Sequence, residues 1–218
     1  MYKDNPEINQ DRVKDTFDLF EQYGFVIFPQ NKKVYENIGF YLLDKKGTVL
    51  EAGCGIGIGS YIMQKYSGSK LFTATDKLKK NIDFGKAIYP TGIDFGVWDI
   101  TSGPYSHILD SGPNEGHDIG KSTFVVCVET IEHIIDVKSA IKNLIASAYK
   151  EVWISTPNKL RNNPPEETPS NPFHVHEFFS EEMLELLKGY KVEILHWETF
   201  EKLDTDTKVN PLVYHVVL

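Results

Sequence analysis

The sequence has no apolar run long enough to cross a membrane. A transmembrane helix needs about 20 consecutive apolar residues, and polar or charged residues interrupt every apolar stretch of this 218-residue chain well before that length. The first residues, MYKDNPEINQDR, are polar and lack the apolar core of a secretory signal peptide. We therefore expect neither a membrane span nor export.

Cysteine is also scarce. The chain has two cysteines, Cys54 and Cys127, and each lies in an apolar, strand-like run. Two buried thiols do not form the disulfide framework of a secreted protein. We expect a reducing compartment, the cytoplasm.

Positive charge is in deficit, because 23 Lys and Arg face 31 Asp and Glu, which gives a net charge of −8. Such a surface repels phosphate backbones unless a local basic patch overrides it. This balance favours a small or neutral substrate over long nucleic acid. We expect a small-molecule or glycan acceptor and no membrane as partner.

Strand-like and helical patterns alternate along most of the chain, which is the pattern of a parallel, doubly wound α/β sheet. Two further strand-like segments close the chain without a helix between them and indicate an antiparallel edge. We expect one domain, with a helical cap over 1–44 and an α/β core over 45–218. The predicted strands are 48–52, 70–76, 92–100, 122–129, 151–156, "KVEILHWE" and "PLVYHVVL", and the predicted helices are 9–22, 33–43, 58–66, 77–87, 136–149 and 180–189.

Two segments have the composition of loops. Residues 101–121 are rich in Gly, Ser and Pro, and residues 157–173 contain five prolines. Long loops in a compact α/β domain tend to be functional lids. For 101–121, a solvated insertion without a role explains the composition equally well.

The stretch VLEAGCGIGIGS, residues 49–60, places four glycines at every second position after a predicted strand. The dinucleotide fingerprint G-x-G-x-x-G/A fails here, because its sixth position is Ile58 or Ser60. Glu51, just before the turn, would repel a pyrophosphate. It suits a ligand with positive charge and no phosphate, such as S-adenosylmethionine.

Acidic residues also end the next three strands. Asp76 comes about 20 residues after the glycine turn, where a carboxylate can accept both ribose hydroxyls. Asp99 ends the third strand, where it can accept the adenine amino group with Ile100 against the ring, and Glu129 ends the fourth. Together with Glu51, these acids predict a ligand site on one edge of the sheet.

The segments VLEAGCGIGIGS, FTATD, GVWDI, VVCVETIEHI and VWISTPN occur in this order, and the chain resembles a class I S-adenosylmethionine-dependent methyltransferase over roughly residues 45–195. The group with ubiquinone-pathway and sugar O-methyltransferases is the most similar. The resemblance implies a Rossmann-like sheet of seven strands, mostly parallel with an antiparallel terminal strand and helices on both faces. One departure is Thr123, where the family often has an acid.

The resemblance also implies how the cofactor is held. Glu51 and the glycines would line its methionine part, Asp76 its ribose and Asp99 its adenine. The full set of predicted cofactor-binding residues is Glu51, Gly53, Cys54, Gly55, Gly57, Asp76, Lys77, Asp99, Ile100 and Glu129.

Three histidines are candidates for the acceptor side of the reaction. Transfer to a hydroxyl needs an oriented nucleophile and a group that takes its proton, which is often a histidine. His174 and His176 follow the proline-rich loop, and His133 lies in the E-T-I-E-H string. We expect these three to act as base or as hydrogen-bond partners of the acceptor.

Two alternatives remain at this point. Glu129, Glu132, His133 and His176 resemble the ligands of metal-dependent enzymes that methylate a terminal 2′-hydroxyl of small RNAs, so a divalent metal is a weaker second hypothesis. The chain is also compatible with a non-catalytic cofactor-binding partner of another methyltransferase. The pattern does not fix the acceptor, the nucleophilic element or the oligomeric state, which includes a homodimer.

Overall fold

The computed structural model describes residues 27–218 apart from 69–70, 90–91, 106–120, 160–170 and 172. The helix expected at 9–22 lies outside this part of the chain. So do most residues of the loops expected at 101–121 and 157–173.

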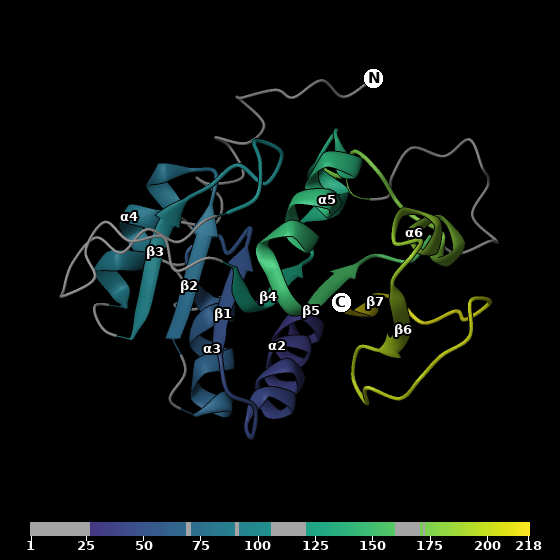
Figure 1. Cartoon of the computed structure of the whole chain (residues 1–218), viewed down its shortest axis with the longest axis horizontal. Helices are drawn as coiled ribbons and strands as arrows, with labels where there is room; N and C mark the ends of the chain where they lie inside the picture. The colour runs from purple at the N-terminus through teal and green to yellow at the C-terminus, as the bar shows by residue number, and fades with distance from the viewer. Residues whose placement is uncertain (1–26, 69–70, 90–91, 106–120, 160–170, 172) are drawn as a thin grey trace.

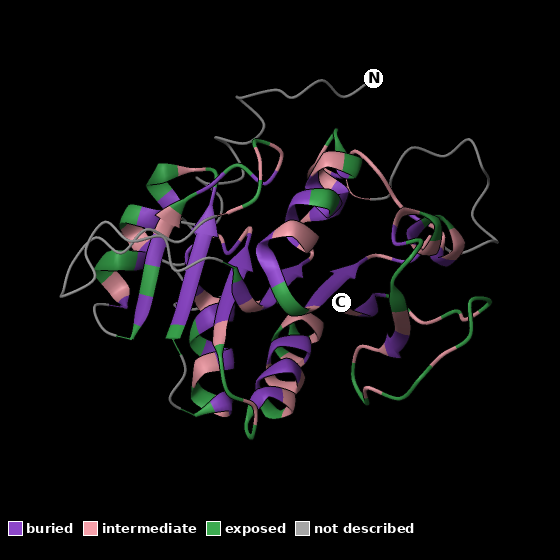
Figure 2. Ribbon diagram, viewed as in Figure 1, coloured by how far each residue is buried: buried purple, intermediate pink, exposed green. Residues whose placement is uncertain are grey.

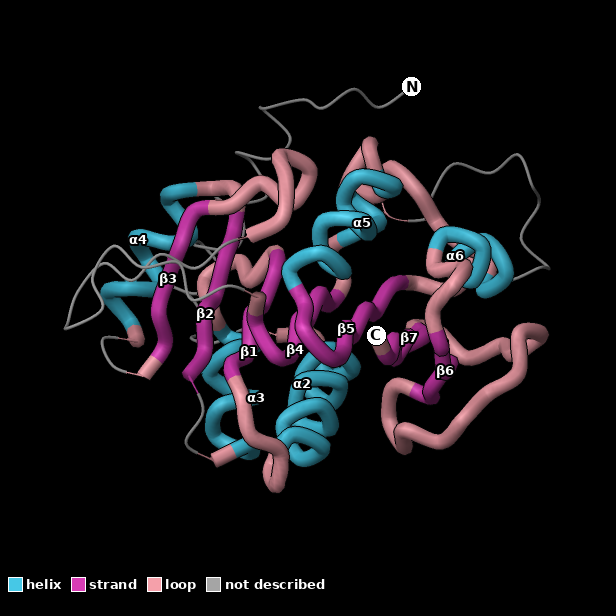
Figure 3. Tube along the Cα trace, in the orientation of Figure 1, coloured by secondary structure: helices cyan, strands magenta, loops and turns pink. Residues whose placement is uncertain are grey.

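The described chain forms one seven-stranded sheet in the order β3-β2-β1-β4-β5-β7-β6, with β3 and β6 at its two edges (Figures 1 and 3). The pairs among β1 to β5 are parallel, and β7 runs antiparallel to both β5 and β6. The predicted fold class is confirmed, including the antiparallel terminal strand. The strands are β1 Thr48–Ala52, β2 Leu71–Asp76, β3 Ile93–Val97, β4 Ser122–Val128, β5 Ala148–Thr156, β6 Lys191–His196 and β7 Leu212–Val217.

Helices cover both faces of this sheet. The helices are α2 Pro29–Leu42, α3 Ile58–Ser67, α4 Lys79–Ile88, α5 Val137–Ser147 and α6 Ser180–Leu186, with a short 3₁₀ turn, η1, at Ile131–His133. One apolar cluster joins α2, α3 and α4 to the sheet, and a second joins α5 and α6 to the other face.

Successive residues of a strand belong alternately to these two clusters, because their side chains point to opposite faces of the sheet. In β1, Val49 belongs to the cluster under α2 and α3, whereas Leu50 belongs to the cluster under α5. In β4, Phe124 and Val125 divide in the same way. The central strands are therefore buried on both sides (Figure 2), which explains why they read as continuous apolar runs.

Several element ends differ from the sequence-based expectation. Helix α2 begins at Pro29 and not at 33, since proline suits the first helical turn, where its missing N–H has no partner to lose. Strand β3 stops at Val97. Helix α6 ends at Leu186 and not at 189, and its N-terminal cap is Phe179, whose N–H donates to the Glu182 carboxylate at 2.8 Å.

No helix in the described part of the chain is both long and apolar enough to span a membrane. Cys54 and Cys127 are buried and free, as expected.

Removing a side chain from the shared core tests this packing. Leu50 is fully buried in β1, whereas Leu71 at the start of β2 is 69% exposed. We expect Leu50→Ala to lower the free energy of unfolding by about 2–5 kcal/mol, and Leu71→Ala to change it by less than about 0.5 kcal/mol. Urea denaturation measures both, and equal losses in the two variants would contradict the core assignment.

Candidate functional site

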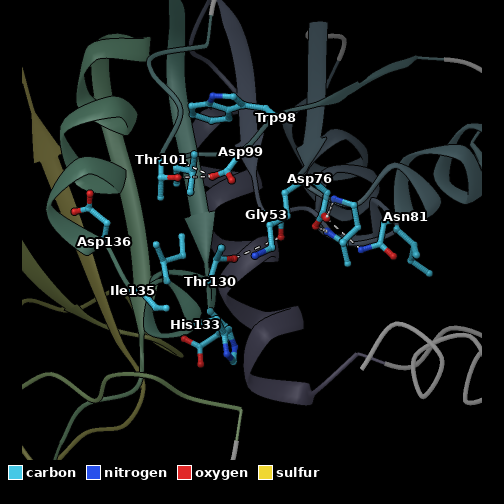
Figure 4. A pocket seen from close by; sticks show the side chains of 17 residues that line it. Gly53, Asp76, Asn81, Trp98, Asp99, Thr101, Thr130, His133, Ile135 and Asp136 are labelled. Atoms are coloured by element: carbon cyan, nitrogen blue, oxygen red, sulfur yellow. Dashed lines mark hydrogen bonds between the residues drawn. The ribbon is translucent and has the colours of Figure 1, made fainter. Parts of the chain in front are cut away.

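A cavity of about 430 Å³ lies where the chain leaves the carboxyl ends of β1 to β4. The strand order reverses between β1 and β4, because the chain proceeds from β1 to β2 on one side and from β4 to β5 on the other. Open α/β sheets bind ligands at such a switch point. The lining residues are Gly53, Gly55, Ile56, Asp76, Lys77, Leu78, Asn81, Trp98, Asp99, Ile100, Thr101, Glu129, Thr130, His133, Ile134, Ile135 and Asp136 (Figure 4).

The glycine loop after β1 forms one wall. Gly53, Gly55 and Gly57 have φ values of +73°, +55° and +89°, a left-handed region that favours glycine. A Cβ on Gly53 would lie 2.6 Å from the Thr130 Oγ1 atom, whereas Gly55 has open space where its Cβ would be. Gly53 and Gly55 line the cavity, whereas Cys54 is buried and, like Gly57, lies behind its surface. The loop thus presents bare backbone to a ligand.

Glu51, which we expected to line the methionine part of the cofactor, lies beneath this loop. Glu51 is fully buried and is not among the described residues that line the cavity. The Ser60 hydroxyl donates to its Oε2 atom at 2.5 Å, and the Tyr35 ring packs against it where Gly59 leaves room. Burial raises the pKa of Glu51 to about 7. Its structural effect is to join β1, α2 and α3 behind the loop.

Asp76 ends β2 as expected and lines the cavity. Its Oδ2 atom accepts the Gly55 N–H at 3.0 Å, and its Oδ1 atom accepts the Leu78 N–H at 2.8 Å and the Asn81 amide at 3.3 Å. Burial raises its pKa. The carboxylate therefore ties the glycine loop to the start of α4, and Lys77 lies beside it on the cavity wall.

Asp99 lines the cavity from the turn after β3, two residues beyond the end of that strand. Its Oδ1 atom accepts hydrogen bonds from the Thr101 N–H at 2.9 Å and the Thr101 hydroxyl at 2.7 Å. Trp98 and Ile100 line the cavity on either side of it in sequence. The Trp98 indole donates to the Gly103 carbonyl at 3.0 Å. The turn combines one carboxylate with apolar side chains, a combination suited to an adenine ring.

Glu129 follows β4 and is half-buried in the cavity wall. Its φ is +47°, a left-handed value that is uncommon for a residue with a Cβ. Its N–H donates to the Ser155 carbonyl at 3.0 Å, and the Ser155 hydroxyl donates to its Oε1 atom at 2.5 Å. Burial of its carboxyl group raises the pKa of Glu129 to about 7.

His133 is the one predicted catalytic histidine that the structure brings to the cavity wall (Figure 4). Its Nδ1 atom lies 2.8 Å from the Phe173 carbonyl. Because a carbonyl only accepts, Nδ1 carries a hydrogen, and in the neutral ring Nε2 has the lone pair. Nε2 lies 3.7 Å from the Glu132 Oε1 atom.

His174 lies behind His133, with the two rings in edge contact at a centroid distance of 4.9 Å. Its Nε2 atom is 3.0 Å from the Asn171 side-chain amide, and its Nδ1 atom is 3.4 Å from the Glu177 carboxylate. The Phe173 N–H donates to the Asn171 Oδ1 atom at 3.0 Å, which turns the NH₂ group toward His174. His174, which we expected on the acceptor side, is not among the described residues that line the cavity.

His176 is also outside the cavity lining. Its Nε2 atom lies 3.3 Å from the Ile135 carbonyl. The backbone N–H groups of Val175 and His176 both donate to the Glu132 carbonyl, at 2.8 and 3.1 Å. The segment after the proline-rich loop therefore holds η1 and the turn that follows it, and His176 supports the cavity wall from outside.

The predicted set of metal ligands is not brought together as expected. In the described part of the chain, ligand atoms of Glu132, His133 and His174 lie within 4.8 Å of one another, and Glu129 and His176 are not in this group. The structure therefore groups two of the four hypothesised ligands, Glu132 and His133, with His174.

Several lining residues were missed from sequence alone. Asn81 and Thr130 are polar residues whose place depends on the turn before α4 and on the close approach of Thr130 to Gly53 (Figure 4). Ile134, Ile135 and Asp136 belong to the connection between η1 and α5. The one available signal was their position just after the E-T-I-E-H string.

Comparison with known proteins agrees with this architecture. No family model matches the sequence. A protein of Mycolicibacterium smegmatis described as a probable S-adenosylmethionine-dependent methyltransferase is 26% identical over 185 residues. The match covers 81% of this chain and spans 65% of the length of that relative.

Solved structures show the same fold at low sequence identity. A TehB-like S-adenosylmethionine-dependent methyltransferase from Corynebacterium glutamicum has a TM-score of 0.64 at 14% identity, covering 97% of this chain and 98% of the other. The plantazolicin methyltransferase BpumL, in complex with a monoazolic desmethylPZN analog and SAH, has a TM-score of 0.63 at 11% identity, covering 97% and 91%. The fold is that of class I S-adenosylmethionine-dependent methyltransferases, and the resemblance inferred from the motifs is confirmed.

Two glycines with similar backbone conformation test whether the glycine loop requires a residue without a Cβ at Gly57. Gly57 has φ +89° and a Cβ there would lie 2.6 Å from the Phe95 ring, whereas Gly189 has φ +96° and open space around it. We expect Gly189→Ala to cost about 1–2 kcal/mol for the left-handed backbone. Gly57→Ala should cost a further 1–3 kcal/mol or so for the steric overlap. Urea denaturation of both variants measures the difference, and equal costs would show that Phe95 moves aside freely.

Proposed function

We propose that this chain is an S-adenosylmethionine-dependent methyltransferase that acts on a hydroxyl of a small molecule or glycan. The observation that carries the proposal is the cavity at the switch point of the sheet. A glycine loop, Asp76 and Asp99 line one part of it, and Glu129, His133 and two isoleucines line another. A cofactor site and an acceptor site would thus share one space.

The residues on the first part fit S-adenosylmethionine, which supplies an electrophilic methyl group on a positively charged sulfur. The bare backbone at Gly53 and Gly55 leaves room for the methionine part. Asp76 would accept the ribose hydroxyls, and Asp99 the adenine amino group, with Ile100 against the ring. Glu51 would act from beneath the loop, by fixing its shape and by its charge.

The acceptor would lie against the second part, which runs from Glu129 to Asp136. Ile134 and Ile135 give this wall an apolar surface, and Ile135 is 48% exposed. His133 would help to position the acceptor against this wall, because its ring is fixed by the contact between its Nδ1 atom and the Phe173 carbonyl. His174 would keep His133 in place and would not touch the acceptor.

A terminal RNA ribose as acceptor, with a metal, is not retained as a second function. The net charge of −8 opposes an extended phosphate backbone. We assign no metal to the group of Glu132, His133 and His174.

We also propose that the protein works in the cytoplasm, because its two cysteines are free and buried. A homodimer stays among the oligomeric states that the sequence allows.

Calorimetric titration with S-adenosylhomocysteine tests the cofactor site. We expect the wild type to bind and Asp76→Asn to lose about 1.5–3 kcal/mol of affinity, roughly tenfold to a hundredfold, since a charged acceptor of hydrogen bonds is removed. The control is Asp83→Asn on the exposed face of α4, whose carboxylate contacts Lys79 at 2.6 Å; it should bind like the wild type.

Each other outcome has a definite meaning. If the wild type does not bind, the methyltransferase proposal is wrong. If both variants lose the same affinity, Asp76 does not contact the cofactor. Adding a chelator should leave the affinity unchanged; a chelator-sensitive affinity would restore the metal hypothesis.

A methyl-transfer assay tests the acceptor side. Phenol, methyl glucoside and ethanol, each with S-adenosylmethionine labelled in the methyl group, serve as a first panel of hydroxyl acceptors. We expect His133→Gln to lower kcat by about a hundredfold or more while S-adenosylhomocysteine binds with unchanged affinity. His196→Gln, in β6, is the matched control. If His133→Gln also loses affinity for S-adenosylhomocysteine, His133 contacts the cofactor and not the acceptor.

A further inference from the structure

Glu129 has an unusual backbone for an ordinary cofactor contact. The φ of +47° costs free energy in any residue with a Cβ, and such strain persists where the surrounding structure enforces it, often at functional sites. Here β5 enforces it, because the carbonyl and the hydroxyl of Ser155 hold both the Glu129 N–H and its Oε1 atom. The carboxyl group is therefore fixed in the cavity wall.

The two carboxyl oxygens differ in their surroundings. Oε1 accepts the Ser155 hydroxyl, and no hydrogen bond from a described residue to Oε2 is found. His133, by contrast, has Nδ1 at the Phe173 carbonyl and Nε2 facing Glu132 at 3.7 Å. The Glu129 Oε2 atom is therefore better placed than the His133 Nε2 atom to take the proton of the acceptor.

We propose that Glu129 is a catalytic residue that takes the proton of the acceptor hydroxyl on Oε2, and that Ser155 is the residue that positions it. This rests on the proposed function, and it assigns Glu129 to the acceptor and not to the cofactor, where the sequence had placed it.

The step balances in atoms and charge. The acceptor oxygen bonds to the methyl carbon, the carbon–sulfur bond breaks and leaves its electron pair on sulfur, and the hydroxyl proton moves to the Glu129 carboxylate. One positive and one negative charge disappear together, so the step leaves no new charge for the cavity wall to stabilise. The protonated Glu129 then returns its proton to water as the product leaves.

The charges around Glu129 are compatible with this role. Asp76, Lys77, Asp99, His133 and Asp136 share the cavity with it, and the Cys127 thiol lies behind it in β4. Burial is the main cause of its raised pKa, and the Ser155 hydrogen bond acts in the opposite direction by stabilising the charged form. A base with a pKa near the working pH is the efficient one.

Three full-length proteins test the assignment: the wild type, Glu129→Gln and Ser155→Ala. Carbon-13 NMR with label in the glutamate carboxyl groups follows each titration, and Glu129→Gln identifies the resonance that belongs to this residue. We expect that resonance to titrate near pH 7 in the wild type and at higher pH in Ser155→Ala, because the hydrogen bond that stabilises the carboxylate is lost. Methyl transfer should rise with pH through the same range, because the carboxylate is the active form.

Calorimetry with S-adenosylhomocysteine separates the two roles of Glu129. We expect Glu129→Gln to bind within about twofold of the wild type, while kcat for the panel acceptors falls at least a hundredfold or so and the rise near pH 7 disappears. A loss of affinity as large as that of Asp76→Asn would return Glu129 to the cofactor. A carboxyl that titrates below pH 5, or a variant that keeps its kcat, would overturn the proposal. Absence of binding to the wild type would instead refute the proposed function.

Discussion

The parallel pairing of β1 with β4 is the constraint on which the site depends. Val49, Leu50 and Glu51 pair with Phe124, Val125 and Val126, and from this pair the chain proceeds outward in both directions across the sheet. The connection after β1 therefore leads toward β2 and the connection after β4 toward β5, on opposite sides, and residues of both line the cavity. Both strands are buried on two faces. At the start of the two connections Gly53 and Thr130 are still in contact, with the Thr130 hydroxyl 3.5 Å from the Gly53 carbonyl.

Much of this arrangement could be predicted from the sequence, because it depends on patterns that act over short distances. Apolar runs bounded by turn residues predicted the strands, and glycines at every second position predicted the loop after β1. Asp76 and Asp99 were found because the carboxyl ends of parallel strands share one edge. The departures have physical causes too. Proline at the start of α2 extended that helix, and Glu51, although it is charged, is covered by Tyr35 and Ser60 from two helices whose packing no local pattern specifies.

The histidines show where such reasoning fails. His174 and His176 are two residues apart, and an extended segment would place both on one side. The chain turns there instead, and the Asn171 side chain, bonded to the Phe173 N–H, draws His174 inward. Glu129 was found for its position after β4, yet its left-handed backbone and its link to Ser155 are visible only in three dimensions. The residue types identified these side chains as candidates, but their positions relative to the cavity depend on the backbone conformation.

The two halves of the cavity belong to separate parts of the chain. Residues of the first three strands and their connections form one half. The other half, after β4, is held by the distant segment around Val175 and His176 through two hydrogen bonds to the Glu132 carbonyl. Substitutions in that segment can shift the wall after β4 while leaving Gly55, Asp76 and Asp99 where they are. On the proposed function, such substitutions would change the choice of acceptor without altering the residues that hold the methyl donor.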